Sequence, residues 1–264
     1  MSRILPRPAA RHAAASLVGI AALAGIAAPA STTAAAPAAT TAATANVATI
    51  SATLSPDRLG ARSALTVSIH IAGGEFGVPA PLQAAVVRFP AGMTLEIPKL
   101  RSCSTEQLQQ FGAHNCPAQS RLGEGHALVQ TRPGAETISE NVTLTAFLGP
   151  PRRLQPTLEV LGEGLTPIAV RMVVTGAVLG DRAPYGERLT MSIPPIPTLP
   201  LAPDGSLVDF SLTVGAKRGK ANKSKTNAIV VPRHCPPGGF PLAAELSYAD
   251  GTSGSERITI PCPR

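Results

Sequence analysis

The sequence predicts an all-β protein with an immunoglobulin-like β-sandwich architecture and one short helix. Apolar and polar residues alternate with period two in many short stretches, and turn-forming residues separate these stretches. No long stretch shows the helical period of about 3.6 residues. The chain also contains 27 Pro and 24 Gly in 264 residues, which argues against a bundle of helices.

Three stretches show the strand pattern most clearly. Leu65 to Ile71, Val208 to Val214 and Leu242 to Tyr248 each place apolar side chains on one face. Asp250-Gly251 predicts a hairpin turn after the third of them. Weaker alternation predicts further short strands near residues 47–54, 84–89, 124–131, 138–147, 157–161, 168–174, 188–193, 227–231 and 255–261.

A single short helix is expected near residues 104–111. Ser104 and Gln107 have the spacing of a capping box, in which each side chain satisfies a backbone N–H of the other residue. Gly112 follows as a stop signal. The helix would therefore cover barely two turns.

The N-terminus has the layout of a secretory signal peptide, which we place at residues 1–30. Three arginines precede the apolar stretch Ala13–Ala28, and small residues follow it. An uncleaved membrane anchor is the alternative, although this stretch is shorter than the roughly 20 residues that span a bilayer. No second apolar stretch of that length follows, so we expect no transmembrane segment after cleavage.

Beyond the signal, residues 31–45 contain almost only Ala, Thr and Pro, which predicts a disordered leader. The turn-rich segment around Pro133-Gly134 is the best break in the remaining chain. It predicts two sandwich units, residues 46–132 and 133–264. The alternative is one continuous sandwich over residues 46–264.

The four cysteines are an even number in a chain predicted to be exported, which indicates disulfides. Sequential pairing, Cys103 with Cys116 and Cys235 with Cys262, is favoured because each half of the chain would then be self-contained. A zinc site is the alternative, but zinc sites usually pair cysteines a few residues apart, and this chain has no such pair. We therefore expect no metal and no other cofactor.

The formal charge of +7 comes largely from two places, the signal peptide and one loop at residues 217–225. The functional interpretation of that loop is contact with an anionic wall polymer or lipid headgroups, and the alternative is a solvated loop. The loop has no aromatic residue to stack bases, so specific nucleic-acid binding is not expected. Its cations are Lys217, Arg218, Lys220, Lys223 and Lys225.

The sequence lacks the short motifs of nucleophile elbows, metalloprotease helices, phosphate-binding loops and dinucleotide sites. His70 falls on the polar face of a predicted strand, and His114 and His234 flank cysteines, so all three are expected to be exposed. A Ser-His-Asp triad has no supporting local motif. With two Tyr, six Phe and no Trp, the chain also offers few aromatic platforms for sugars. We assign no catalytic residue.

One pattern of residues resembles a known family. Cys103-Ser104 is followed by Cys116-Pro117-Ala118-Gln119-Ser120-Arg121-Leu122-Gly123, a C-S…C-P-x-x-S-x-x-G signature. This signature resembles that of uncharacterised secreted, disulfide-containing all-β proteins of actinobacteria, over roughly residues 80–262. The resemblance implies an exported all-β protein and brings no catalytic residue with it.

Together these observations favour a monomeric, exported, non-enzymatic binding or structural module of the cell surface or extracellular space. Its ligand is not indicated by the sequence. One alternative is a secreted hydrolase with an active site built from loops. The other is an envelope-associated protein that contacts anionic wall polymer or lipid through residues 217–225.

Overall fold

The computed structural model describes residues 44–96, 101–167, 169–215 and 229–263, all of which belong to one compact unit. The predicted signal peptide at residues 1–30, most of the leader and the basic loop at residues 217–225 lie outside the described residues.

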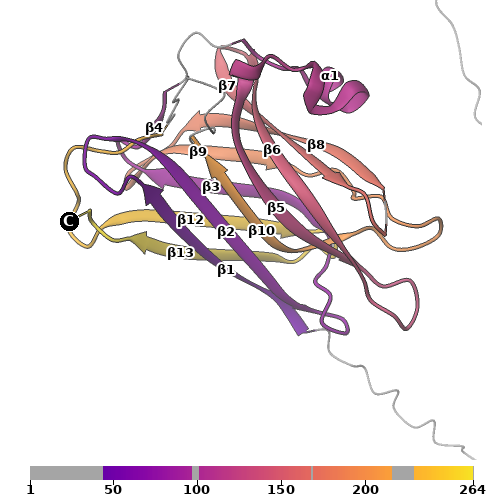
Figure 1. Cartoon of the computed structure of the whole chain (residues 1–264). Coiled ribbons are helices and arrows are strands. Elements are labelled where there is room, and N and C mark those ends of the chain that lie inside the picture. Colours follow the sequence, from indigo (N-terminus) through magenta and orange to yellow (C-terminus); the bar gives the residue numbers. More distant parts are fainter. Residues whose placement is uncertain (1–43, 97–100, 168, 216–228, 264) are drawn as a thin grey trace, which may run out of the picture. The chain divides into compact units, whose positions relative to one another are not determined.

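The described residues are mostly β-structure, as the alternation predicted, and their strands form a single antiparallel sheet (Figure 1). Every predicted stretch overlaps a strand, although residues 168 and 227–228 of two of these stretches lie outside the described residues. The two-residue β4 was missed because so short a strand cannot show alternation. The strands are β1 Thr44–Ser55, β2 Arg62–Gly74, β3 Leu82–Pro90, β4 Thr94–Leu95, β5 Arg121–Thr131, β6 Ile138–Arg152, β7 Gln155–Gly164, β8 Val170–Gly180, β9 Tyr185–Ser192, β10 Ser206–Val214, β11 Ile229–Val230, β12 Phe240–Tyr248 and β13 Ser253–Ile260.

The order of strands across the sheet is β13-β12-β3-β9-β8-β7-β6-β5-β10-β2, with β1 and β11 both on β2 and β4 on β11. Strands from before residue 132 lie between strands from after it in this order. For example, β3 lies between β12 and β9, and β5 lies between β6 and β10. The sheet therefore runs without interruption across the predicted boundary.

The sheet curls until its two edges meet. The edge strands β1 and β13 lie next to each other, and Asn46 of β1 reaches the turn before β13. Its side-chain amide donates to Asp250 Oδ2 at 3.3 Å and to Thr252 Oγ1 at 3.2 Å. One face of the sheet is thus turned inward, and the other faces outward.

Alternation along the strands fills the inner face with apolar side chains. Leu65, Ile69 and Ile71 of β2 are buried while His70 between them is exposed, so the predicted faces of this strand are confirmed. In β10 the register shifts between Leu207 and Asp209. As a result, Leu207 and not the expected Val208 lies among the inner apolar residues.

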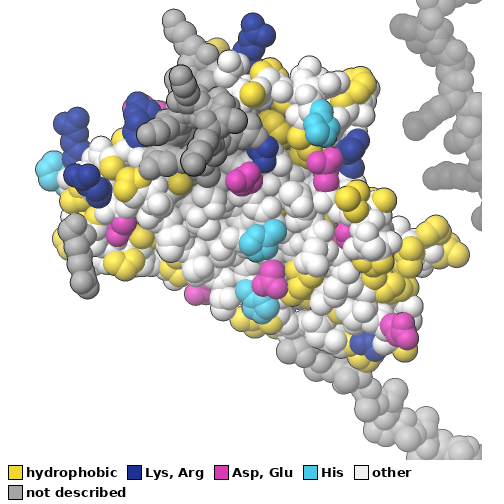
Figure 2. Space-filling model, in the orientation of Figure 1, with side chains coloured by type: hydrophobic (Ala, Val, Ile, Leu, Met, Phe, Trp, Pro, Cys, Tyr) yellow, Lys and Arg dark blue, Asp and Glu magenta, His cyan; other side chains and the backbone are white. Residues whose placement is uncertain are grey.

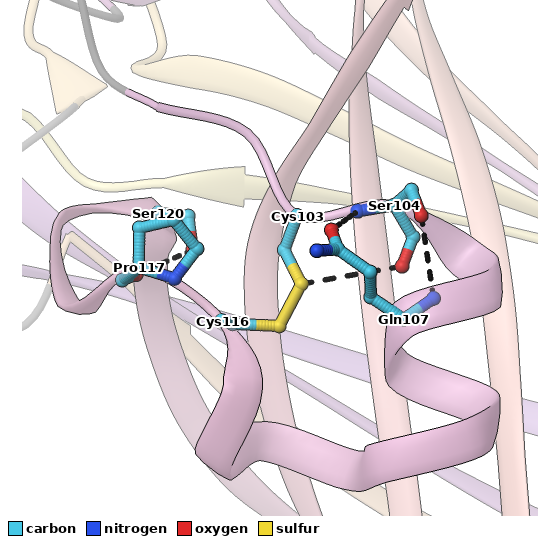
Figure 3. The surroundings of a disulfide bond; sticks show 6 residues. All are labelled: Cys103, Ser104, Gln107, Cys116, Pro117 and Ser120. Carbon is cyan, nitrogen blue, oxygen red and sulfur yellow. Dashed lines mark hydrogen bonds between the residues drawn. A yellow bond between two sulfur atoms is a disulfide. The ribbon is translucent and has the colours of Figure 1, made fainter.

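A second, smaller core lies on the outer face of β6, β7 and β8. The helix α1, Thr105–Phe111, is followed by two short 3₁₀ turns at Gly112–Asn115 and Ala118–Ser120. Leu108 of α1 packs with Phe147 of β6 and Leu161 of β7. The predicted capping box is confirmed: Ser104 Oγ accepts from the Gln107 N–H at 3.3 Å, and Gln107 Oε1 accepts from the Ser104 N–H at 3.1 Å (Figure 3).

Both predicted disulfides are confirmed. Cys103 bonds Cys116 beside α1, and Cys235 bonds Cys262, with Cα–Cα separations of 5.4 and 5.8 Å (the first is shown in Figure 3). The second bond ties the segment before β12 to the segment after β13. Two intact disulfides indicate an oxidising environment. Among the described helices, none is long and apolar enough to cross a membrane.

Candidate functional site

The inner face of the sheet encloses two adjoining cavities of about 100 Å³ each. The first lies toward β4 and β11, where Met93, Leu95 and Ile229 line it. The second lies toward the segment between β9 and β10, where Ile193 and Ile196 line it. Apart from Thr94 and Glu187, every described residue that lines either cavity is apolar.

The two cavities share four of their lining residues, so they adjoin one another and make up one apolar region of the interior. The shared residues come from four different strands and are Ile69, Val160, Met191 and Phe210. A dry cavity of about 150 Å³ with walls of Leu, Ile and Phe can hold benzene. Each of the two cavities, at about 100 Å³, is of the same order as that volume.

Side chains around these cavities point inward without being fully buried. Val67, Leu189, Met191 and Phe210 all keep accessible surface although they lie on the inner face of the sheet. Protein interiors are normally packed as densely as organic crystals. Partly uncovered apolar side chains on an inner face therefore mark space that the protein's own atoms do not fill.

All three methionines in the described residues line this region. Met93 borders the first cavity, Met172 the second, and Met191 both. Methionine is unbranched and polarisable, so it adapts its shape to a variable apolar neighbour. This composition suits walls that adjust to an occupant.

Among the described residues that line the cavities, Glu187 is the single one with an ionisable side chain. It lies on β9 two residues before Leu189, and it pairs with Phe89 of β3, which also lines the first cavity. Directly paired residues in an antiparallel sheet share a face. Burial raises the pKa of Glu187, and a hydrogen bond from the Leu95 backbone N–H opposes that rise.

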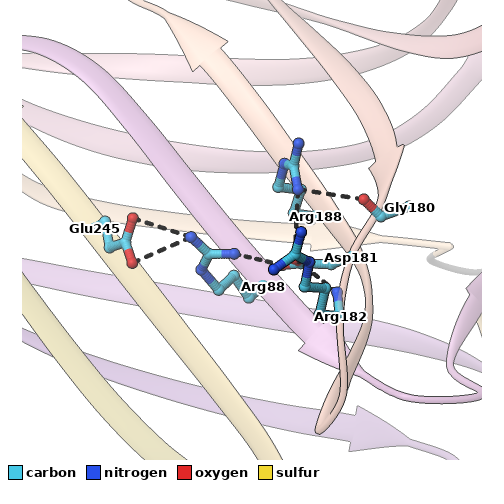
Figure 4. A network of polar contacts seen from close by, with 6 residues as sticks. All are labelled: Arg88, Gly180, Asp181, Arg182, Arg188 and Glu245. Carbon is cyan, nitrogen blue, oxygen red and sulfur yellow. Dashed lines mark hydrogen bonds and ion pairs between the residues drawn. The ribbon is translucent and has the colours of Figure 1, made fainter.

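The outer side of the same strands carries a network of charged side chains (Figure 4). Arg88 of β3 donates to Asp181 Oδ2 at 2.5 Å and to both carboxylate oxygens of Glu245 at 3.2 Å. Arg188 donates to Asp181 Oδ1 and to the Gly180 carbonyl, both at 3.3 Å. These contacts fix the turn between β8 and β9, next to Glu187.

The outer face of β1, β2, β10 and β5 forms a second, polar feature, a shallow groove of about 620 Å³. Figure 2 shows histidine and acidic side chains gathered in the middle of this face. His70 Nδ1 lies 2.7 Å from Asp209 Oδ1, and Ser68 Oγ lies 2.9 Å from Ser211 Oγ. His126 is paired in register with Ser211.

This groove brings a histidine and a carboxylate together without completing a triad. In the described part of the chain, no serine hydroxyl forms a hydrogen bond with His70 or His126, and the serines bond each other instead. A nucleophilic serine needs a histidine within hydrogen-bond reach. The arrangement therefore offers no activated nucleophile in this conformation.

The other two described histidines lie elsewhere. His114 is exposed in the first 3₁₀ turn, and His234 is exposed beside the second disulfide. The exposure predicted for His70, His114 and His234 is confirmed. Over the ranges that the structure describes, no three His, Cys, Asp or Glu side chains form a group able to hold a metal ion.

A buried carboxyl lies under α1, outside the cavities. Glu159 of β7 is 0% exposed, and its Oε2 accepts a hydrogen bond from the Thr175 hydroxyl at 2.6 Å. Among the described residues, its Oε1 has no hydrogen-bond partner. Burial raises the pKa of Glu159, which favours the neutral carboxylic acid.

The comparisons with known proteins add no relative: no family model, curated protein or solved structure matches this chain. The resemblance to secreted actinobacterial proteins therefore stays a prediction. Sequence reasoning missed the cavity because alternation shows which side chains point inward but not how densely they pack. It also missed Glu187, although the alternation of Glu187, Leu189 and Met191 could have placed the carboxyl on the inner face.

Proposed function

We propose that this protein is an exported, non-enzymatic binding module that holds a small apolar molecule inside its curled sheet. The observation that carries the proposal is the pair of adjoining cavities with almost wholly apolar walls. Ligand sites are typically concave, apolar and furnished with a few polar groups. The cavities fit that description, and Glu187 supplies the polar group.

The two disulfides support export of the protein. They favour an oxidising compartment, and the N-terminal arginines followed by Ala13–Ala28 are typical of a signal peptide. The immunoglobulin-like sandwich and the monomeric state remain expectations from the sequence.

The proposed function makes a quantitative claim about ligand length. Each buried CH₂ group contributes about 0.8 kcal/mol, or about a fourfold gain in affinity. The affinity for straight-chain alcohols should therefore rise with each added carbon until the cavities are full, and then level off. Adsorption to an exposed surface would give no such plateau.

Isothermal titration calorimetry with a series from 1-hexanol to 1-dodecanol tests this claim. We expect saturable binding of one molecule per chain, with affinity that increases and then stops increasing. Heats that never saturate, or an affinity that does not depend on chain length, would rule the proposal out.

A pair of variants links such binding to the cavity. Val178 lines the first cavity on the inner face of β8, and a phenylalanine there would occupy the space. Ala72 lies exposed on β2 and serves as the matched control. Val178→Phe should weaken 1-octanol binding at least tenfold, and Ala72→Phe should leave it unchanged.

The alternative of envelope association through Lys217, Arg218, Lys220, Lys223 and Lys225 stays a prediction, since this loop lies outside the described residues. It is compatible with ligand binding because the loop joins Val214 and Ile229, which both line the first cavity. Replacing the five cations by Gln or Ser should abolish retention on anionic wall polymer or lipid at low salt. Unchanged retention would remove this alternative.

A further inference from the structure

Glu187 is placed where a bound molecule would meet it. It belongs to the inner row of β9, together with Leu189 and Met191, and all three line the first cavity. Its partner on β3 is Phe89, whose ring lines the same cavity. The Glu187 side chain therefore lies on the inner face and borders the apolar region.

The surroundings of Glu187 leave its carboxylate able to accept further hydrogen bonds. One bond comes from the Leu95 backbone N–H. Within the described ranges no Lys, Arg or His forms an ion pair with Glu187, and the nearby Arg88 and Arg188 are engaged by Asp181 on the outer side. A carboxylate has two oxygens and about four acceptor positions.

Gly180 provides room beside the carboxyl group. It is the register partner of Glu187 on β8, so the two residues share a face. A side chain added at Gly180 would meet no atom within 4 Å, and the residue is exposed. Space next to Glu187 is thus open, and a head group could lie there while its chain occupies the cavity.

We propose that the cavity selects molecules with one apolar chain and one hydrogen-bond-donating head group, a primary ammonium above all, which the Glu187 carboxylate binds beside Gly180. This inference rests on the proposed function and names its ligand class. An ammonium donates up to three hydrogen bonds and carries the opposite charge. A carboxylate head group would place two like charges together in a partly dry site.

The chemistry sets an order of affinity among ligands of equal chain length. Octylammonium should bind most tightly and octanoate most weakly, with 1-octanol between them, since its hydroxyl carries no charge and donates a single hydrogen bond. Charge-assisted hydrogen bonds are about twice as strong as neutral ones. We expect octylammonium to bind at least tenfold more tightly than octanoate at neutral pH and low salt.

Calorimetry with these three ligands on the full chain tests the inference. Glu187→Gln removes the charge and keeps the shape, so it should reduce octylammonium affinity at least tenfold, improve octanoate affinity and leave 1-octanol within about twofold. Glu136→Gln, at an exposed loop position, is the matched control and should change none of them.

A second variant tests the same head-group position without changing Glu187 itself. Gly180 has no left-handed backbone angle, so a side chain is tolerated there, and Gly180→Leu should obstruct the head group. It should weaken octylammonium more than 1-octanol.

The outcomes separate this inference from the proposed function. Equal binding of octylammonium and octanoate, or a preference that survives Glu187→Gln, would overturn the role of Glu187 while 1-octanol binding still supports an apolar site. If none of the three ligands binds, both the proposed function and the preference for an ammonium head group are wrong.

Discussion

The two halves of the interior are built by the same alternation and filled very differently. Where β12 and β13 meet β1, inward side chains are fully packed: Phe240 and Leu242 are 0% exposed, Tyr248 is 2% exposed, and none of the three lines either cavity. Around β8, β9 and β10, inward residues such as Leu189 and Phe210 keep accessible surface. The packed half holds the fold together, and the loose half provides the cavities.

This difference shows that space in the interior is local and not a general looseness of the sheet. Large residues such as Tyr248 and Phe240 fill the packed half, and the Cys235–Cys262 disulfide holds the segments at its end. The loose half is bordered on the outside by the Arg88–Asp181 network, which fixes the β8–β9 turn without filling the interior (Figure 4). The cavities can therefore stay open while the strands around them are held in place.

Truncating one leucine in each half tests whether the two halves differ in packing. Leu242→Ala removes a fully buried side chain and should lower the free energy of unfolding by about 3 kcal/mol. Leu189 borders existing empty space. Leu189→Ala should therefore lower the free energy of unfolding by only about 1 kcal/mol, because fewer contacts are lost. Urea denaturation measures both. Equal losses would show that the two halves are equally packed.

Filling the loose half should change binding more than stability. Val178→Phe is expected to weaken 1-octanol at least tenfold and to shift the free energy of unfolding by no more than about 1 kcal/mol, since the ring enters existing space. A loss of several kcal/mol would mean that the cavity is too small for the ring and that the half is tighter than described.

In the small core under α1, the buried carboxyl of Glu159 should make the stability of the protein depend on pH. Its folded-state pKa is raised by burial, so between the unfolded and folded pKa values the native protein binds more protons than the unfolded chain. Stability should therefore fall as pH rises through that window. Glu159→Gln should remove this slope, giving similar stability at pH 4 and a gain of about 1 kcal/mol at pH 8. A variant with the wild-type slope would place the titration elsewhere.

The smallest expected effect concerns the outer network. Arg88→Met removes the contacts to Asp181 and Glu245 and should lower the free energy of unfolding by less than about 1 kcal/mol, because Glu245 is half exposed and Arg188 still pairs with Asp181. Octylammonium affinity should fall slightly as the β8–β9 turn loosens. The two effects are read by urea denaturation and calorimetry, and unchanged values in both would show that the network does not support the site.

Much of the fold could be predicted from sequence because local chemistry determines it. Alternation placed the strands, the Ser104 and Gln107 spacing placed α1, and the even number of cysteines gave both disulfides. The curl that brings β1 beside β13 could not be predicted, since it depends on pairing between distant strands such as β3 and β9. The cavity could not be predicted either, because it arises from unequal packing of side chains that obey one pattern.

The methyl groups of the cavity methionines report most directly on whether a small apolar molecule enters the cavities. With ¹³C-methyl-labelled methionine, addition of 1-octanol should shift the resonances of Met93, Met172 and Met191, which line the cavities. A methionine introduced at exposed Ala72 should not respond. Saturable shifts confined to the three cavity methionines are the predicted result, and cavity methionines that do not respond at saturating 1-octanol would contradict the account.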